Sequence, residues 1–263
     1  MPVNPTELIS PICAFQDNYI WMIKNPADKS AFVVDPGDAV PVFETLNNQG
    51  LTLTGILVTH HHYDHTGGIS ELLAAYPVPV YGPKASSFKL IDHRLSEGDL
   101  VQVYGFDFTV MELPGHTLDH IAYFSHNTKP PVLFCGDTLF VSGCGRVFEG
   151  TFEQMHHSLM KLSKLPPATL VYCAHEYTLA NLDFAKIVDG TNTDLKDFLS
   201  TTQQIRKKHA PTVPSSIEME LAINPFLRTD KASIKKAAED HANKKLSSPV
   251  AVFNVIRSWK DSF

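Results

Sequence analysis

Four potential metal ligands occupy six consecutive positions, in the pattern His-x-His-x-Asp-His from His60 to His65. Neutral imidazole nitrogens and carboxylate oxygens are the usual ligands of zinc and similar divalent cations outside thiolate sites. In an extended loop, residues two apart point the same way, so we expect His60 and His62 to bind one cation. Asp64 and His65 lie further along and can face a second cation. The crowding disfavours the alternative, a surface histidine cluster without a metal.

The flanking sequence places these ligands on a turn between a strand and a helix. Gly55 to Val58 form a short apolar run typical of a buried strand, and Ile69 to Ala75 have the spacing of a helix. Side chains on such a turn are held by rigid elements and converge on open space. The sequence therefore predicts a metal site within residues 59–68.

Three more potential ligands, His116, Asp137 and His175, each come shortly after an apolar run that predicts a strand. A lone histidine or aspartate at the end of a strand is usually structural, so none of them would attract notice alone. Together with the turn they make seven ligands, the number expected of two cations that share one carboxylate.

The order of the predicted elements changes near Tyr177. Up to that residue, β-rich apolar runs alternate with helical spacing, the helices being expected at residues 40–48, 69–75 and 152–165. Beyond it, helical spacing recurs at residues 179–188, 194–209, 231–245 and 248–260, and Pro211, Pro214 and Pro225 predict irregular chain in between. We expect an α/β layered domain over residues 1–177 and a helical domain over residues 178–263.

Composition and charge narrow the class of protein. The chain has 263 residues, 43% of them hydrophobic, and a net charge of −6, which argues against nucleic acid as a partner. We find no membrane-spanning apolar run, no signal peptide at the N-terminus and no Cys-x-x-Cys pair, and therefore expect a cytoplasmic protein with reduced thiols. Acidic residues outnumber basic ones over residues 1–177, whereas basic residues outnumber acidic ones over residues 178–263, which indicates a second domain with a separate role.

Longer motifs resemble a known family. The ligand series, with Gly-His-Thr at 115–117 and Gly-Asp-Thr at 136–138, resembles that of the metallo-β-lactamase superfamily. Within it, several segments are similar to glyoxalase II, also called hydroxyacylglutathione hydrolase: FQDNYIW at 15–21, CGDTLF at 135–140, GCGR at 143–146, HEYT at 175–178 and RSWK at 257–260. The similarity runs essentially from end to end.

The resemblance implies an αββα sandwich with an added C-terminal helical domain and two divalent metals, foremost zinc, with iron or manganese as alternatives. It implies the following ligands: His60, His62 and His116 for metal 1, Asp64, His65 and His175 for metal 2, and Asp137 as the bridge. The implied reaction is hydrolysis of S-D-lactoylglutathione and related 2-hydroxyacylglutathione thioesters to a hydroxy acid and glutathione, the second step of methylglyoxal detoxification. A hydroxide shared by the metals would attack the thioester, with Asp64 and Asp137 as the catalytic carboxylates.

Substrate binding is expected to rest on the C-terminal residues, because glutathione thioesters are anionic. Arg257 and Lys260 share a face of a predicted helix. Composition alone favours a solvated terminal helix, whereas the resemblance implies that both side chains bind the glycine carboxylate of glutathione. It also implies contacts from Arg146, Tyr177 and Phe148. Some relatives carry a tyrosine at the last position, and Phe148 lacks the hydroxyl for that polar contact. We expect a monomer that binds this small molecule and neither nucleic acid nor membrane.

Other functions occur on the same fold. A persulfide dioxygenase shares the early histidines but uses a single iron, and β-lactamases, lactonases and phosphodiesterases share the fold. The long helical tail with Arg257 and Lys260 argues against all of these. A non-catalytic metal-binding protein is disfavoured by the full ligand set, because catalytic sites rather than structural ones leave positions open to water. Among the other histidines, His61 is expected to face away from the ligands and His120 to support one of them.

Overall fold

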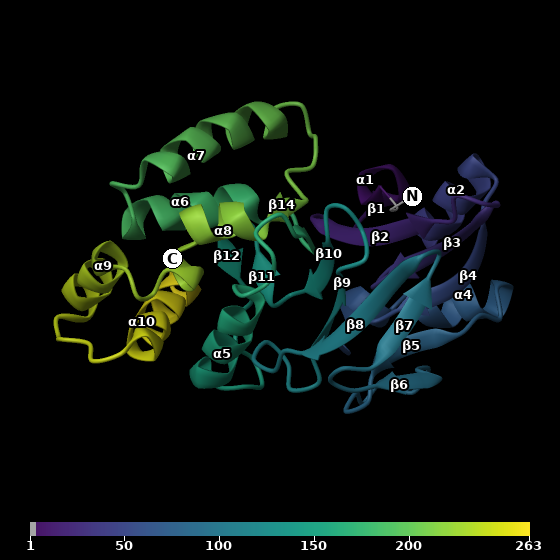
Figure 1. Cartoon of the computed structure of the whole chain (residues 1–263), viewed down its shortest axis with the longest axis horizontal. Coiled ribbons are helices and arrows are strands. Elements are labelled where there is room, and N and C mark those ends of the chain that lie inside the picture. Colours follow the sequence, from purple (N-terminus) through teal and green to yellow (C-terminus); the bar gives the residue numbers. More distant parts are fainter. Residues whose placement is uncertain (1–3) are drawn as a thin grey trace.

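The computed structural model describes residues 4–263. Residues 1–3 lie outside the described residues, and they belong to the N-terminal segment in which we expect no signal peptide. Two six-stranded sheets lie next to each other, with α2 and α4 beyond the first sheet and helices α6 to α10 gathered at the opposite end of the molecule (Figure 1). Within residues 4–263, no helix is long and apolar enough to cross a bilayer.

The first sheet has the strand order β1-β2-β3-β4-β5-β6. Its first three strands are antiparallel and the others parallel. Side chains alternate across β2, so Ile20 and Met22 pack in one apolar cluster with the helices, while Trp21 belongs to the cluster between the sheets. The elements of this half are α1 Pro5–Leu8, β1 Ile9–Ala14, β2 Asn18–Lys24, β3 Ser30–Val34, α2 Val40–Gln49, β4 Thr52–Leu57, α3 Tyr63–Thr66, α4 Ile69–Ala75, β5 Val80–Pro83 and β6 His93–Leu95.

The second sheet has the order β14-β13-β10-β9-β8-β7 and is antiparallel except where β10 pairs with β13. Trp21 of the first sheet meets Tyr172 of the second edge to face, with ring centroids 4.8 Å apart, and its indole N–H donates to the Cys173 carbonyl. The main core therefore lies between the sheets. The strands are β7 Leu100–Val103, β8 Phe106–Glu112, β9 Ile121–Ser125, β10 Val132–Gly136, β13 Leu170–Cys173 and β14 Ser215–Ser216, with β11 Leu139–Phe140 and β12 Gly143–Cys144 as a separate hairpin.

Helices dominate the rest of the chain. Helix α5, Phe152–Leu162, begins at a capping box formed by Thr151 and Gln154 and packs against α10. The helices after Tyr177 are α6 Thr178–Val188, α7 Thr193–Arg206, α8 Ile217–Ile223, the 3₁₀ helix η1 Pro225–Leu227, α9 Ala232–Ala242 and α10 Pro249–Asp261. The layers confirm the predicted αββα sandwich with added C-terminal helices.

The prediction of irregular chain from Pro211 to Pro225 was wrong, because α8 and η1 lie within it. The Ser216 side chain caps α8 by accepting a hydrogen bond from the Met219 backbone N–H at 3.2 Å. Pro225 opens η1, where a missing N–H costs nothing. The prolines therefore delimit short helices here. The first strand was also overlooked, since Pro11 interrupts its pattern.

A buried polar network ties the C-terminal helices to the β11–β12 hairpin. Glu220 Oε2 accepts hydrogen bonds from the Ser142 backbone N–H at 2.8 Å and from Asn224 Nδ2 at 2.9 Å. Asn224 Nδ2 also lies within hydrogen-bond distance of the Phe140 and Gly143 carbonyls. Glu220 and Asn224 are fully buried, so the hairpin is held by partners that water cannot replace.

Replacing Glu220 with glutamine is expected to flatten the dependence of stability on pH between pH 5 and 8. Burial, only partly offset by hydrogen bonds, raises the pKa of this carboxyl from 4.5 to about 7. Because the folded-state pKa is raised, the stabilisation is full below pH 4.5 and is lost as the pH rises through 7. The loss should be on the order of 2–3 kcal/mol in the wild type and absent in Glu220→Gln.

Urea unfolding at several pH values measures this difference. Glu218→Gln, on the exposed face of the same helix, is the matched control and should follow the wild type. Parallel stability curves for the wild type and Glu220→Gln would contradict the expectation.

Candidate metal centre

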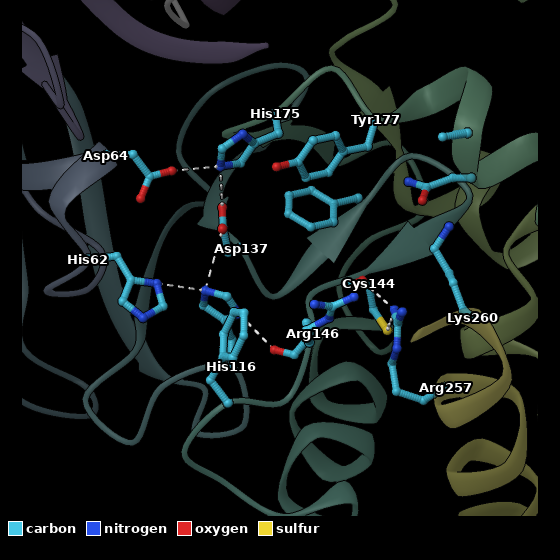
Figure 2. Close-up of a pocket in the computed structure, with 14 residues that line it drawn as sticks. His62, Asp64, His116, Asp137, Cys144, Arg146, His175, Tyr177, Arg257 and Lys260 are labelled. Carbon is cyan, nitrogen blue, oxygen red and sulfur yellow. Dashed lines mark hydrogen bonds and ion pairs between the residues drawn. The ribbon is translucent and has the colours of Figure 1, made fainter. Parts of the chain in front are cut away.

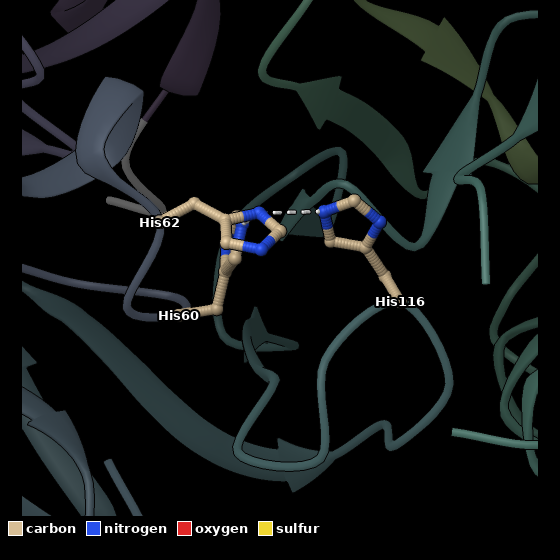
Figure 3. Close-up of side chains that lie close together, drawn as sticks. All are labelled: His60, His62 and His116. Carbon is tan, nitrogen blue, oxygen red and sulfur yellow. Dashed lines mark hydrogen bonds between the residues drawn. The ribbon is translucent and has the colours of Figure 1, made fainter. Parts of the chain in front are cut away.

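The first three predicted ligands meet at the ends of their strands. His60 and His62 follow β4, and His116 follows β8. His62 Nδ1 lies 3.1 Å from His60 Nε2 and 3.0 Å from His116 Nε2 (Figure 3). Three imidazole nitrogens therefore point at one another, an arrangement that suits a shared cation.

The other three terminal ligands form a second group. His65 Nε2 lies 3.5 Å, and His175 Nε2 3.4 Å, from Asp64 Oδ2. Asp137 lies between the two groups: its Oδ1 is 3.4 Å from His175 Nε2, and its Oδ2 is 3.5 Å from His116 Nε2 (Figure 2). The structure thus brings all seven predicted ligands together, with Asp137 where a bridging carboxylate would lie.

The donor set fits a metal centre. Within the described part of the chain, His65 Nε2, His175 Nε2 and Asp137 Oδ1 are buried and have no hydrogen-bond partner. The distances of 3.4 to 3.5 Å between them are longer than a normal hydrogen bond. Buried polar atoms without partners are costly, and a divalent cation at about 2.0–2.2 Å from each would satisfy all three.

Two aspartates that the sequence analysis did not recognise as functional orient the ligands. Asp35 Oδ2 lies 3.0 Å from His65 Nδ1, and Asp17 Oδ1 lies 2.8 Å from His175 Nδ1. An Nδ1–H that donates to a carboxylate leaves Nε2 free to bind a metal. Asp35 directly follows β3, the same signal that marked Asp137, and could have been found that way.

The electrostatics of the centre favour positive charge. Burial opposes a charge on His65, but the carboxylates of Asp137 and Asp35 outweigh burial and raise the pKa of this imidazole to about 10. Burial likewise opposes the charge of Asp64, yet a hydrogen bond from His175 and the charge of His65 hold the pKa of that carboxyl below its usual value. An arrangement of this kind attracts cations.

Two further histidines, His120 and His61, lie beside the candidate ligands. His120 Nε2 accepts a hydrogen bond from the Asp137 backbone N–H at 3.1 Å and so supports a ligand. Burial, followed by the neighbouring His116, lowers the pKa of His120 to about 3, which keeps it neutral for this role. His61 instead pairs with Asp119, its Nδ1 2.9 Å from Asp119 Oδ1.

One cavity of about 380 Å³ connects the ligands to the C-terminal helices. Figure 2 shows the candidate metal ligands at one end and Arg257 and Lys260 at the other, with Arg146 between them. The Tyr177 ring stacks on His175 with centroids 4.7 Å apart, and burial raises the pKa of its hydroxyl to about 12. Phe148 is 60% exposed and lies beside His116, with centroids 5.3 Å apart. All five predicted substrate-binding residues line this cavity.

Arg257 departs from the solvated side chain that composition alone favoured. Only 3% of the residue is exposed, and its Nη1 donates to the Cys144 carbonyl at 2.9 Å. Lys260 lies one turn further along α10, with Nζ 5.3 Å from the centre of the Phe184 ring. Burial, followed by the charge of Arg257, lowers the pKa of Lys260 to about 8, so the amine is still largely protonated at neutral pH.

The fold and the cluster of histidines and aspartates define a protein of the metallo-β-lactamase superfamily, whose family model matches residues 15–175. The crystal structure of the B3 metallo-β-lactamase BLEG-1 matches with a TM-score of 0.61 and 24% sequence identity. That match covers 83% of this chain and 98% of the BLEG-1 chain. The crystal structure of ETHE1 from Myxococcus xanthus matches with the same TM-score and identity, over 95% of this chain and 99% of the ETHE1 chain. At this identity the likeness concerns the fold alone.

The C-terminal helices narrow the assignment. Residues 176–263 match the model of the hydroxyacylglutathione hydrolase C-terminus. Hydroxyacylglutathione hydrolase of Nitrosomonas eutropha is 48% identical over 257 residues, which cover 97% of this chain and 98% of that protein. That of Idiomarina loihiensis is 49% identical over 249 residues, covering 95% and 97%. The chain belongs to the hydroxyacylglutathione hydrolase family.

Proposed function

We propose that the protein hydrolyses S-D-lactoylglutathione and related S-2-hydroxyacylglutathione thioesters at a centre of two divalent cations. Membership in its family makes it a thioester hydrolase. The observation that carries the finer proposal is a cavity lined both by five of the seven proposed ligands, His62, Asp64, His116, Asp137 and His175, and by the cationic side chains of Arg146, Arg257 and Lys260. A metal centre beside an anion site suits a substrate that carries both a thioester and a carboxylate.

The ligand assignment is part of this proposal. We assign His60, His62 and His116 to one cation, Asp64, His65 and His175 to the other, and Asp137 to both. Nitrogen and oxygen donors without a thiolate suit zinc first, and also iron and manganese. Two such cations would supply Lewis acidity and make hydroxide available near neutral pH.

Asp64 is placed to orient the attacking water. Its side chain is 41% exposed, and Asn18 Nδ2 donates to its Oδ2 at 3.1 Å, which fixes the carboxylate. The low pKa of this carboxyl keeps it ionised, so it can accept a hydrogen bond from water and hold the oxygen toward the thioester carbonyl. The leaving thiolate has a free pKa of about 8.5, so departure needs no strong general acid.

The far end of the cavity would bind glutathione. Arg257 and Lys260 would hold its glycine carboxylate, together with Arg146. The Tyr177 hydroxyl stays protonated and can donate a hydrogen bond to the peptide, whereas Phe148 offers only a ring face. In this proposal, residues 1–177 form the catalytic domain and residues 178–263 the substrate-binding domain. A cytoplasmic location and a monomeric state stay predictions.

Purified protein loaded with excess zinc is expected to bind two cations per chain and to hydrolyse S-D-lactoylglutathione. Elemental analysis after gel filtration measures the stoichiometry, and loss of thioester absorbance measures turnover. Removal of the metals with a chelator should abolish activity, and added zinc should restore it, because the chain alone offers no strong electrophile. A plateau at one iron per chain, with no thioester hydrolysis, would favour the persulfide dioxygenase class instead.

A further inference from the structure

We propose that Asp261 is a positioning residue that holds Arg146 and Arg257 in place for the glycine carboxylate of glutathione. The inference rests on the proposed function, because it deepens the assignment of the cationic end of the cavity. Asp261 is the last residue of α10 and does not itself line the cavity. It would therefore act through the two arginines, without touching the substrate.

The geometry that carries the proposal is one shared oxygen. Asp261 Oδ1 accepts a hydrogen bond from Arg146 Nε at 3.0 Å and another from Arg257 Nη2 at 3.1 Å. Arg146 belongs to the loop after β12, whereas Arg257 precedes Asp261 by one helical turn. The carboxylate thus joins two distant parts of the chain at the point where both arginines face the cavity.

Each arginine depends on this carboxylate in a different way. The Arg257 side chain is only 4% exposed, and a buried guanidinium needs a compensating charge. Within residues 4–263, Asp261 is the one carboxylate in ion-pair contact with it. The Arg146 side chain is 54% exposed, and its only carboxylate partner in that range is again Asp261. Without that partner the Arg146 guanidinium would be left with its contact to the exposed Phe148 ring, whose centre lies 5.9 Å away, so the side chain would sample more rotamers.

Asp261 also lowers the repulsion between like charges. Arg146, Arg257 and Lys260 line one end of the same cavity, and no carboxylate lies within ion-pair distance of Lys260 in the described chain. The Asp261 carboxylate offsets one positive charge and uses one N–H of each arginine. Arg257 Nη1 also donates to the Cys144 carbonyl. The guanidinium N–H groups that remain, together with the Lys260 amine, are left to bind a substrate carboxylate. Hydrogen-bond donors that are already held in place improve binding, because fewer side chains lose conformational entropy when the substrate binds.

Asp261→Asn is the test, because the amide keeps the shape and removes the charge. We expect KM for S-D-lactoylglutathione to rise by about fivefold, with kcat and metal content close to wild type. Calorimetry with glutathione itself should show a matching loss of affinity. Asp261→Glu restores the charge and should recover part of the affinity. Asp240→Asn is the matched control: it removes the same charge from an exposed ion pair with Lys236, and should leave KM unchanged.

Two comparisons show how Asp261 acts. The S-lactoyl thioester of γ-glutamylcysteine lacks the glycine, so its KM should be the same for the wild type and Asp261→Asn. In an Arg146→Ala background, Asp261→Asn should have a smaller effect, because one of its two partners is gone. An unchanged or lowered KM in Asp261→Asn would overturn the proposal. If Arg146→Ala and Arg257→Ala also leave KM unchanged, the glutathione site itself is wrongly assigned. If these two variants raise KM while Asp261→Asn does not, the glutathione site stands and the positioning role of Asp261 is wrong.

Discussion

Asp137→Ala is expected to lower kcat/KM for S-D-lactoylglutathione on the order of 10³-fold, with a much smaller loss of bound metal. Asp137 is the one ligand whose two carboxylate oxygens face different groups, with Oδ1 near His65 and His175 and Oδ2 near His116. Three terminal ligands would still hold each cation in the variant. The spacing of the two cations, on which the reaction depends, would be lost. Steady-state kinetics and elemental analysis on the same samples measure both effects.

The matched control for Asp137→Ala is Asp189→Ala. Asp189 is also a buried aspartate, with 2% of its surface exposed, but it pairs with Arg228 among the C-terminal helices. Its loss costs stability and should leave the metal content and the rate of the folded protein near wild type. If Asp137→Ala kept most of its activity together with two cations, Asp137 would not be the bridge.

Lys260→Ala and Arg257→Ala are expected to raise KM by about ten- to a hundredfold while kcat stays nearly constant, since each removes a charge-assisted hydrogen bond. These residues lie at the end of the cavity away from the proposed metal ligands (Figure 2). Contacts made equally in the ground state and the transition state change KM and not kcat. Initial rates over a range of substrate concentrations separate the two constants, and metal content should be unchanged.

The two variants differ in how much of the fold they disturb. Arg257 is buried and donates a hydrogen bond to the Cys144 carbonyl, so Arg257→Ala also removes structural contacts. Lys260→Ala removes chiefly the charge. Lys235→Ala is the control for the loss of one lysine, because the Lys235 side chain is 48% exposed and pairs with Glu239 away from the cavity. Added salt should weaken substrate binding by the wild type more than by either variant. A thioester of a neutral thiol should be hydrolysed equally by all. Unaltered KM in both variants would refute the glutathione assignment.

The seven proposed metal ligands could be brought together from the sequence because each comes within a few residues of an apolar strand or on the short turn that follows β4. The sheets then bring the strand ends together. Asp17 gave no such signal. It lies in the turn between β1 and β2 and reaches His175 from 158 positions away in the sequence. Such a partner is visible only once the two sheets are packed.

The layered fold was predictable from the alternation of apolar runs, since strand and helix periods differ. The short helix α8 was not, because three prolines mask it and its stability comes from the Ser216 cap and from the buried side chains of Ile217 and Ile223. The burial of Arg257 could not be read from the sequence either. Charged side chains are usually solvated, whereas this guanidinium packs against Cys144 and the Phe226 ring and pairs with Asp261.

The separation of the cavity into two ends has an evolutionary consequence. Every proposed metal ligand lies before residue 176, whereas Arg257, Lys260 and Asp261 occupy one turn of α10. If the proposed assignment holds, substitutions in this turn of α10 would change which thioesters are accepted and leave the proposed metal ligands untouched. A duplicated gene could therefore acquire a new substrate through drift in one helical turn, while selection preserves the hydrolytic centre unchanged.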